Sequence, residues 1–384
     1  LGLVPTPLLY FACGRRREAS AAMVTASHNP REYNGLKVVL AGMSATTADI
    51  GALRDRIRDA NLGTGQGSCS RRDIVPAYIE AMAADISLAR GMTLVVDCGH
   101  ATASPVAPSL FRALGCTVIE RDCECDSALA DARMLDPAQP KQLGALAEAV
   151  VAAEADLGLG FDADGDRLGV VDSRGDFIAA DRLLMLLAAD VLARHPGSPI
   201  IYDVKCSHHL APEIERHGGR PVMWKSGHSN LKQKLRELDA PLAGELSGHI
   251  VFADRWNGFD DALYAAGRLL EVLALDPRAS HEVFAELPAG LGTPELFMPL
   301  MHDEAERVMQ TVVGMADRLD GVKIITIDGL RVEHARGWGL VRASNTQSGL
   351  VFRFEADDQD ALDRIQGLFR HMMHTAAPGL GLPF

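Results

Sequence analysis

The segment Met23-Val-Thr-Ala-Ser-His-Asn-Pro-Arg-Glu-Tyr-Asn-Gly-Leu-Lys37 decides how the rest of the chain is interpreted. It begins with an apolar run, and Pro30 disfavours helical geometry at Asn29, so the chain is predicted to turn there at the end of a strand. Asn34-Gly35 is a second turn signal, and residues 36–40 are predicted to form the next strand. The pattern therefore indicates two short strands joined by a polar loop.

That loop carries a candidate nucleophile. Ser27 stands beside the imidazole of His28, and Lys37 returns near it on the second strand. A serine hydroxyl close to a base and a cation can be activated for attack. The competing interpretation is a serine that only caps a turn, which is common for this residue type.

Length and composition indicate a globular protein of several domains. The chain has 384 residues, of which 47% are hydrophobic and 23% charged, as is ordinary for soluble proteins. A net charge of −13 argues against a general nucleic-acid or anionic-membrane surface. Repeated strand–loop–helix patterns predict related α/β units, followed by a small α+β domain. The expected domains are residues 1–73, 74–175, 176–290 and 291–384.

The cysteines and apolar segments favour a cytoplasmic protein. The seven cysteines are odd in number and contain no C-x-x-C pair, which suits a reducing compartment better than a disulfide framework. The apolar helix predicted over 183–193 carries Asp190 and is too short to span a bilayer. The chain opens at Leu1, in what resembles the approach to a strand, with no visible signal peptide. We therefore expect a chain that is short at its N-terminus.

The loop Phe161-Asp-Ala-Asp-Gly-Asp-Arg167 lies between two apolar runs. Its alternating carboxylates, Asp162, Asp164 and Asp166, would repel one another without a cation, and hard oxygen ligands suit Mg²⁺ or Ca²⁺. The loop fits an EF-hand poorly, because the glycine and glutamate positions of that motif are occupied by Arg167 and Ser173. The alternative is a solvated acidic turn, which flanking buried strands make costly.

Two further loops offer polar groups. In Gly244-Glu-Leu-Ser-Gly-His249, the side chains of Glu245, Ser247 and His249 alternate, so in an extended chain they would share one face and could bind sugar hydroxyls. In Arg342-Ala-Ser-Asn-Thr346, a guanidinium followed by small polar residues could cradle a phosphate. Alone, each loop could equally be an ordinary polar strand face or hairpin turn.

Together the four loops are far more specific, and the chain resembles the α-D-phosphohexomutase superfamily, closest to its bacterial phosphomannomutase/phosphoglucomutase branch. The resemblance covers essentially the whole chain and implies three related mixed-sheet α/β domains and a C-terminal α+β domain around a central cleft. It implies a phosphorylated serine at Ser27. It implies a Mg²⁺ site formed by Ser27, Asp162, Asp164 and Asp166. It implies substrate contacts from Lys205, Glu245, Ser247, His249, Arg342, Ser344, Asn345 and Thr346. The candidates for proton transfer or charge stabilisation are His28, Lys37, Arg167 and His228.

The activity that the resemblance implies is reversible phosphoryl transfer between C1 and C6 of mannose or glucose phosphates. The reaction would pass through phospho-Ser27 and a 1,6-bisphosphate, with one Mg²⁺ per chain and glucose or mannose 1,6-bisphosphate as activator. The expected partners are hexose phosphates, without nucleic acid or membrane, and the expected state is a monomer or weak dimer.

Three alternatives stay open. The first is an inactive sugar-phosphate-binding remnant, because the chain lacks the family's usual first stretch. The second is a phosphoglucosamine mutase. The third is a haloacid-dehalogenase-like phosphatase with Asp162 as nucleophile, although that reading leaves the loops of Ser27, Glu245 and Arg342 without a role.

Overall fold

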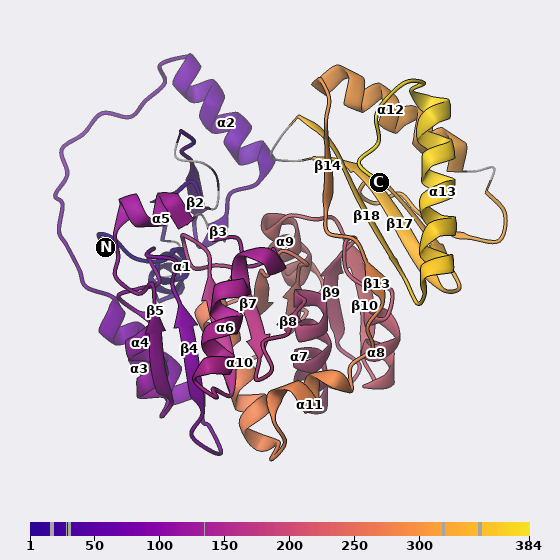
Figure 1. Cartoon of the computed structure of the whole chain (residues 1–384). Coiled ribbons are helices and arrows are strands. Elements are labelled where there is room, and N and C mark those ends of the chain that lie inside the picture. The colour runs from indigo at the N-terminus through magenta and orange to yellow at the C-terminus, as the bar shows by residue number, and fades with distance from the viewer. Residues whose placement is uncertain (16–18, 28, 30–31, 134, 317–318, 345–347) are drawn as a thin grey trace.

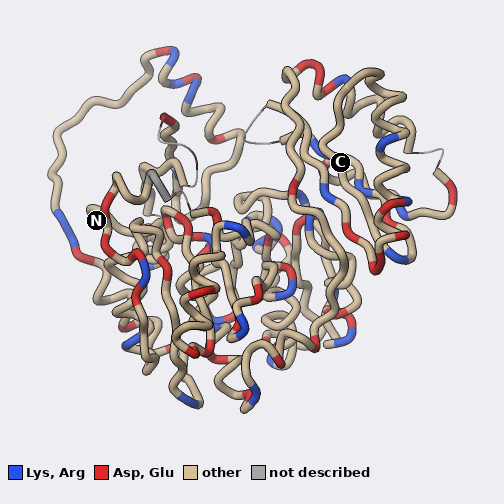
Figure 2. The backbone as a smooth tube through the Cα atoms, viewed as in Figure 1, with Lys and Arg blue, Asp and Glu red and all other residues tan. Residues whose placement is uncertain are grey.

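The computed structural model describes residues 1–384 except 16–18, 28, 30–31, 134, 317–318 and 345–347. Its strands form four separate sheets, one in each of four successive parts of the chain. The first three parts form a body of helices and sheets, and the fourth stands beside it at the upper right of Figure 1. Acidic and basic residues are spread over all four parts (Figure 2).

The first domain contains a three-stranded antiparallel sheet of order β1-β2-β3. Its elements are α1 (Thr6–Gly14), β1 (Ala21–Val24), β2 (Leu36–Leu40), β3 (Met43–Ser44) and α2 (Thr47–Arg58). The expected strand approach at the start of the chain is wrong, because residues 6–14 are helical. Pro7 lies in the first turn of α1, where a missing amide hydrogen costs nothing, and Leu8 anchors the helix in the core.

The second domain is built on a mixed sheet of order β5-β4-β6-β7-β8. Its helices are α3 (Val75–Asp85), α4 (Ala107–Ala113), α5 (Ser127–Arg133), the 3₁₀ turn η1 (Pro140–Leu143) and α6 (Gly144–Ala152). Its strands are β4 (Thr93–Asp97), β5 (Thr117–Arg121), β6 (Leu157–Phe161), β7 (Leu168–Asp172) and β8 (Phe177–Ile178). Strand β6 pairs parallel with β4 and antiparallel with β7, so the turn between β6 and β7 lies where the carboxyl ends of β4 and β6 meet.

The third domain repeats this plan with a mixed sheet of order β10-β9-β11-β12. Its helices are α7 (Ala180–Arg194), α8 (Leu210–Arg216), α9 (His228–Glu237), α10 (Ala262–Leu275) and α11 (Ser280–Ala285). Its strands are β9 (Pro199–Asp203), β10 (Arg220–Trp224), β11 (Leu242–Gly244) and β12 (Ile250–Phe252). Lys205 and Glu245 lie in the loops that follow β9 and β11, and His228, which comes after β10, is the first residue of α9.

The fourth domain is an antiparallel sheet of order β13-β18-β17-β16-β15, with β14 also paired to β18. Its elements are β13 (Leu291–Gly292), β14 (Leu296–Pro299), α12 (His302–Met315), β15 (Lys323–Ile325), β16 (Leu330–His334), β17 (Gly337–Ala343), β18 (Gly349–Ala356) and α13 (Gln359–Ala376). The predicted fold class, three α/β domains followed by a C-terminal α+β domain, is confirmed. The first sheet differs from the expectation in being antiparallel throughout its described strands.

The buried side chains show how these domains are joined. One continuous cluster runs from Val4 in the first domain through Leu94 in the second to Phe284 in the third. The fourth domain has its own cluster, from Met298 to Met373. Burial of apolar area therefore fixes the first three domains against one another, while the fourth meets them mainly through other contacts. Among the described residues, no helix is both long and apolar enough to cross a membrane.

Candidate active site

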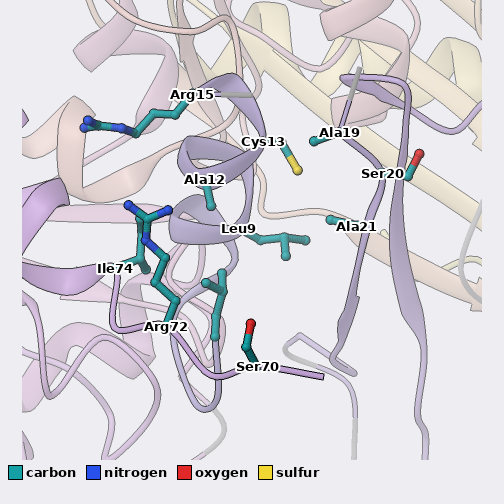
Figure 3. Close-up of a pocket in the computed structure, with 11 residues that line it drawn as sticks. Leu9, Ala12, Cys13, Arg15, Ala19, Ser20, Ala21, Ser70, Arg72 and Ile74 are labelled. Carbon is teal, nitrogen blue, oxygen red and sulfur yellow. The ribbon is translucent and has the colours of Figure 1, made fainter. Parts of the chain in front are cut away.

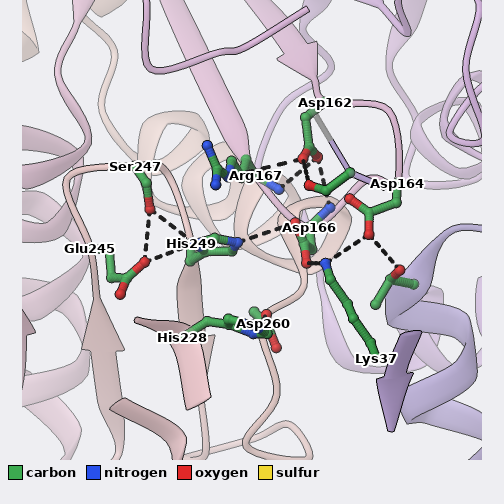
Figure 4. A network of polar contacts seen from close by, with 12 residues as sticks. Lys37, Asp162, Asp164, Asp166, Arg167, His228, Glu245, Ser247, His249 and Asp260 are labelled. Carbon is green, nitrogen blue, oxygen red and sulfur yellow. Dashed lines mark hydrogen bonds and ion pairs between the residues drawn. The ribbon is translucent and has the colours of Figure 1, made fainter. Parts of the chain in front are cut away.

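The acidic loop lies between β6 and β7 (Figure 4). Asp162, Asp164 and Asp166 are all buried, and one carboxylate oxygen from each lies within 4.8 Å of the others. The loop is closed by its own backbone, since Asp162 Oδ1 accepts the amide hydrogens of Asp166 and Arg167, both at 3.1 Å. Three buried carboxylates this close repel one another unless cations lie among them.

Ser27 approaches this loop from the first domain. Its Oγ donates to Asp162 Oδ2 at 3.1 Å, and its amide donates to Thr25 Oγ1 at 2.8 Å. Its φ of 52° lies in the left-handed region that serine seldom adopts. The loop is tight, because a side chain at Gly35 would come within 2.9 Å of the Thr25 carbonyl oxygen. His28 lies outside the described residues.

Lys37 supplies the nearest cation. It lies on β2 opposite Met23, and its Nζ lies 2.7 Å from Asp164 Oδ2 and also pairs with Asp166. Burial lowers the pKa of Lys37, but the carboxylates of Asp166 and Asp164 outweigh burial and raise this pKa above its ordinary value. The side chain is therefore an ammonium ion held among the carboxylates.

Arg167 adds a second cation on the other side of the loop. Its Nη1 lies 3.4 Å from Asp136 Oδ1, and its Nε lies 4.0 Å from Asp162 Oδ2. Burial raises the pKa of Asp162 well above its ordinary value, and the neighbouring Asp166 carboxylate adds to that rise. The carboxyl group nearest Ser27 is thus less ready to carry a charge than an ordinary aspartate in the absence of further cations.

These donors fit a small divalent cation. The loop offers three carboxylates, and Asp164 Oδ1 is buried with no hydrogen-bond partner among the described residues. Ser27 Oγ lies at the edge of the same cluster. Hard oxygen donors of this kind suit Mg²⁺, which would share the carboxylates of Asp164 and Asp166 with the Lys37 ammonium.

Sequence reasoning missed one residue that holds this loop in place. Thr6, at the start of α1, donates from Oγ1 to Asp164 Oδ2 at 2.8 Å, and its amide donates to the Asp164 carbonyl oxygen at 2.8 Å. Helix α1 thereby positions the acidic loop from 158 residues away in sequence. A lone threonine before a proline carries no sequence signal for such a role.

The predicted sugar loop has the expected residues in an unexpected conformation. The extended chain predicted for Glu245, Ser247 and His249 is wrong, because the Gly248 amide donates to the Glu245 carbonyl oxygen at 3.1 Å and closes a turn after β11. The turn still gathers the three side chains: Glu245 Oε2 accepts from Ser247 Oγ at 2.8 Å and lies 2.9 Å from His249 Nδ1. Gly248 allows it, since a Cβ there would lie 2.8 Å from the carbonyl oxygen of Leu168.

His249 links this turn to the acidic loop. Its Nε2 lies 3.2 Å from Asp166 Oδ1. Burial lowers the pKa of His249, but the Asp166 carboxylate and the hydrogen bonds to Asp166 and Glu245 outweigh burial and raise this pKa to about 9. His249 is therefore a cation between two carboxylates. Its contact with Asp166 joins the sugar loop of the third domain to the three buried aspartates of the second.

His228 lies next to His249, with ring centroids 5.2 Å apart in a stacked arrangement. Its Nδ1 lies 2.7 Å from Asp260 Oδ2, and Asp260 Oδ1 also pairs with the buried Lys232 at 2.6 Å. Burial and the Lys232 ammonium lower the pKa of His228. Asp260 and Lys232 were not found by sequence reasoning. The Asp-Asp pair before α10 and a lysine four residues after His228 are weak signals.

Lys205 of the third domain and Arg342 of the fourth each pair with an acidic residue of the fourth domain. Lys205 Nζ lies 3.0 Å from Glu295 Oε1, and Arg342 Nε lies 3.1 Å from Asp328 Oδ2. The described part of the phosphate loop includes Ser344, whose amide donates to the Gly349 carbonyl oxygen at 3.0 Å. Asn345 and Thr346 lie outside the described residues.

Two hollows show where small molecules could enter. One, of about 500 Å³, is lined by parts of the second, third and fourth domains and includes Ser247, Glu295 and Arg353. The other, of about 510 Å³, lies between α1, β1 and the segment before α3, with Arg15 and Arg72 at its wall (Figure 3). None of the predicted site residues lines the second hollow. The first, beside the sugar loop, is the one that belongs with the site.

Comparison with known proteins assigns the family. The chain matches the four successive domain families of phosphoglucomutase/phosphomannomutase, namely alpha/beta/alpha domains I, II and III over residues 1–62, 76–175 and 179–290 and the C-terminal domain over 298–371. These matches define the class of protein, an enzyme built from four consecutive phosphohexomutase domains. The chain belongs to the phosphoglucomutase/phosphomannomutase family, as the sequence motifs predict.

Individual relatives support this at the level of whole chains. The chain is 47% identical over 384 residues to phosphomannomutase/phosphoglucomutase of Pseudomonas aeruginosa strain PAO1, spanning all of this chain and 82% of that protein. It is 42% identical to a phosphoglucomutase of Neisseria gonorrhoeae, over 98% of this chain and 82% of that one.

Solved structures agree. A phosphoglucomutase/phosphomannomutase family protein of Burkholderia thailandensis superposes with a TM-score of 0.92 at 45% identity, over 99% of this chain and 83% of that one. An N-acetylphosphoglucosamine mutase of Aspergillus fumigatus, in complex with GlcNAc-6P and magnesium, shares the fold at 13% identity and a TM-score of 0.65, over 96% of this chain and 92% of that one.

Proposed function

We propose that the protein interconverts the 1-phosphate and 6-phosphate of mannose or glucose through a phosphorylated Ser27 and a hexose 1,6-bisphosphate. The observation that carries this proposal is the contact of Ser27 Oγ with Asp162 Oδ2 at 3.1 Å. A hydroxyl at the edge of three buried carboxylates and a lysine ammonium is suited to carry a phosphoryl group beside a divalent cation. The names of relatives that are 42–47% identical support the same activity.

Mg²⁺ held by Asp162, Asp164, Asp166 and Ser27 would neutralise charge on the phosphoryl group. The chain's own residues would transfer the proton and stabilise the remaining charge. The Ser27 Oγ–P bond breaks as the phosphorus bonds to a sugar hydroxyl oxygen. That hydroxyl loses its proton to a base, and the Ser27 oxygen takes up a proton as it leaves. His228 suits the base, because its lowered pKa leaves a neutral imidazole at neutral pH. The cation of Lys37 suits stabilisation of the transferred charge. His28 is a further candidate.

Substrate orientation would be set by the third and fourth domains. We assign hydroxyl binding to Glu245 and Ser247, whose side chains already share a hydrogen bond, and attraction of the phosphate to Lys205 and Arg342. Ser344, with Asn345 and Thr346, would complete the phosphate site. One such site can serve both ends of the sugar, because the bisphosphate must turn around between the two transfers. Buried guanidinium and ammonium groups are strong phosphate ligands.

The test is phosphoserine formation. The wild-type protein is incubated with Mg²⁺ and glucose 1,6-bisphosphate, and intact mass and peptide mapping locate any phosphate. We expect one phosphate, on Ser27, acid-stable and absent after chelation of Mg²⁺, and no phosphate on Ser27→Ala. Ser87→Ala, an exposed serine between α3 and β4, is the matched control and should label like wild type.

The outcomes separate the alternatives. A protein that binds hexose phosphate but never acquires phosphate is a binding remnant, which contradicts the proposal. An acid-labile phosphate on Asp162 also contradicts the proposal, because it identifies Asp162 as the nucleophile of a haloacid-dehalogenase-like phosphatase. If Ser27 is labelled, comparing kcat/KM for mannose, glucose and glucosamine 1-phosphates identifies the preferred sugar.

A further inference from the structure

A second cluster of side chains that can bind a metal ion, two histidines and two carboxylates, lies where the third domain meets the fourth. His208 and His209 stand in the loop between β9 and α8, Glu355 lies near the end of β18, and Asp357 follows that strand. The side chains are partly open to solvent, with exposed fractions of 16% for His208, 22% for His209 and 34% for Asp357. The group is thus most open at Asp357, while the Nε2 atom of His209 is itself buried. None of them belongs to the acidic loop or to the substrate loops above.

Two contacts of Asp357 match the spacing of ligands on a tetrahedral ion. Asp357 Oδ1 lies 3.2 Å from Nε2 of His208 and 3.2 Å from Nε2 of His209. When Zn²⁺ binds nitrogen or oxygen ligands at about 2.0–2.1 Å in tetrahedral geometry, two ligand atoms on one ion are about 3.3 Å apart. One ligand atom from each of His208, His209 and Glu355 also lies within 4.8 Å of the others.

Glu355 completes the arrangement from behind. Its Oε1 lies 4.0 Å from His208 Nδ1, beyond hydrogen-bond distance, and that nitrogen is buried with no hydrogen-bond partner among the described residues. The carboxylate is itself fixed, because it accepts from Ser207 Oγ at 2.5 Å and from Trp338 Nε1 at 3.2 Å.

We propose that His208, His209 and Asp357, backed by Glu355, form a binding site for a divalent transition metal ion of the Zn²⁺ class, separate from the Mg²⁺-type acidic loop. Two imidazoles with carboxylate oxygen favour Zn²⁺ and its neighbours in the first transition row over Mg²⁺, which prefers oxygen ligands alone. The site takes two ligands from one domain and two groups from another.

This placement gives the ion a structural effect. The third and fourth domains have separate apolar cores, so a metal bridge between the loop after β9 and the end of β18 would add a direct bond between them. An ion that binds only the folded, joined arrangement stabilises it by mass action. Zn²⁺ should therefore raise the unfolding temperature of the fourth domain.

The experiment is a Zn²⁺ titration of metal-stripped protein in excess Mg²⁺, with a chromogenic chelator as competitor. Excess Mg²⁺ keeps the acidic loop from taking up Zn²⁺. The test variant is the double substitution His208→Gln and His209→Gln. The controls are His302→Gln, whose imidazole is 78% exposed on α12, and Asp164→Asn, which removes a carboxylate of the acidic loop.

We expect wild type, His302→Gln and Asp164→Asn each to bind one Zn²⁺. The affinity of the double variant for Zn²⁺ should be lower by at least about 100-fold, because loss of a group that only orients a metal ligand already lowers metal affinity by about 10–100-fold. Zn²⁺ should also raise the unfolding midpoint of wild type but not of the double variant. Equal Zn²⁺ binding by wild type and the double variant overturns the proposal, as does loss of the ion in Asp164→Asn alone. If the double variant does not fold, Asp357→Asn, with its more exposed side chain, replaces it under the same criteria.

Discussion

At the scale of single residues, Lys37 balances the charge of the acidic loop. Its ammonium contacts Asp164 and Asp166, the same carboxylates that would hold a divalent cation. In Lys37→Met without metal, these buried carboxylates lose their partner, which costs about 3–5 kcal/mol when a buried pair is broken. We expect the unfolding midpoint of metal-free Lys37→Met to fall and Mg²⁺ to raise it by more than in wild type. Thermal unfolding with and without Mg²⁺ measures both effects.

The matched control is Lys323→Met, because Lys323 pairs with Glu333 at 3.0 Å but is 70% exposed. Exposed pairs contribute about 1 kcal/mol or less, so its midpoint and its response to Mg²⁺ should resemble wild type. If Mg²⁺ raises the midpoints of Lys37→Met and wild type equally, the ammonium and the cation do not share these carboxylates.

At the scale of elements, α10 begins at a buried carboxyl group whose pKa is raised. Asp261 caps this helix by accepting from the Tyr264 amide at 2.9 Å, and Tyr78 Oη and Trp256 Nε1 also donate to it. Burial raises the pKa of Asp261 to about 6. Between about pH 4 and 6 the folded protein therefore keeps a proton that the unfolded chain has released. The resulting stability is fully present below about pH 4 and is lost as the pH rises through 6.

The size of this loss is about 3 kcal/mol, at about 1.4 kcal/mol for each pH unit. Asp261→Asn keeps a capping oxygen but cannot ionise, so the variant should lose less stability than wild type between pH 4 and 7. Denaturant unfolding at these two pH values gives the comparison. Asp358→Asn is the control, because Asp358 caps α13 through the Ala361 amide and its side chain is 35% exposed. An unchanged pH dependence in Asp261→Asn would contradict the assignment.

The elements also show what sequence could and could not reveal. Local patterns predicted the turn at Ser27, the acidic turn between β6 and β7 and most strands, because these depend on neighbouring residues. The conformation around Gly248 was not predicted, since alternating polar residues fit a strand and a turn equally well. Thr6, Asp260 and Glu295 were missed for another reason: their roles come from contacts between distant elements, which no local pattern records.

At the scale of the whole molecule, the fourth domain is joined to the third largely by polar contacts. Arg331 on β16 is fully buried and donates from Nη1 to the carbonyl oxygens of Val204 at 2.6 Å and Cys206 at 2.7 Å. Its guanidinium also stacks over Trp338 at 3.7 Å from the ring centroid. The neighbouring apolar cluster is small, consisting of Val204, Trp338 and Leu340 with two partly buried residues.

Arg331→Met should therefore destabilise the contact between the third and fourth domains more than it destabilises either domain alone. Two buried carbonyl groups would lose their donor, and each unsatisfied group costs about 1–3 kcal/mol. We expect calorimetry to show the fourth domain, residues 298–371 by its family match, unfolding at a lower temperature and apart from the first three, whose shared core is untouched. Arg336→Met, in the turn between β16 and β17 and 59% exposed, should unfold like wild type. If the transition of the fourth domain does not move in Arg331→Met, the apolar contact at Trp338 holds the domains together without this arginine.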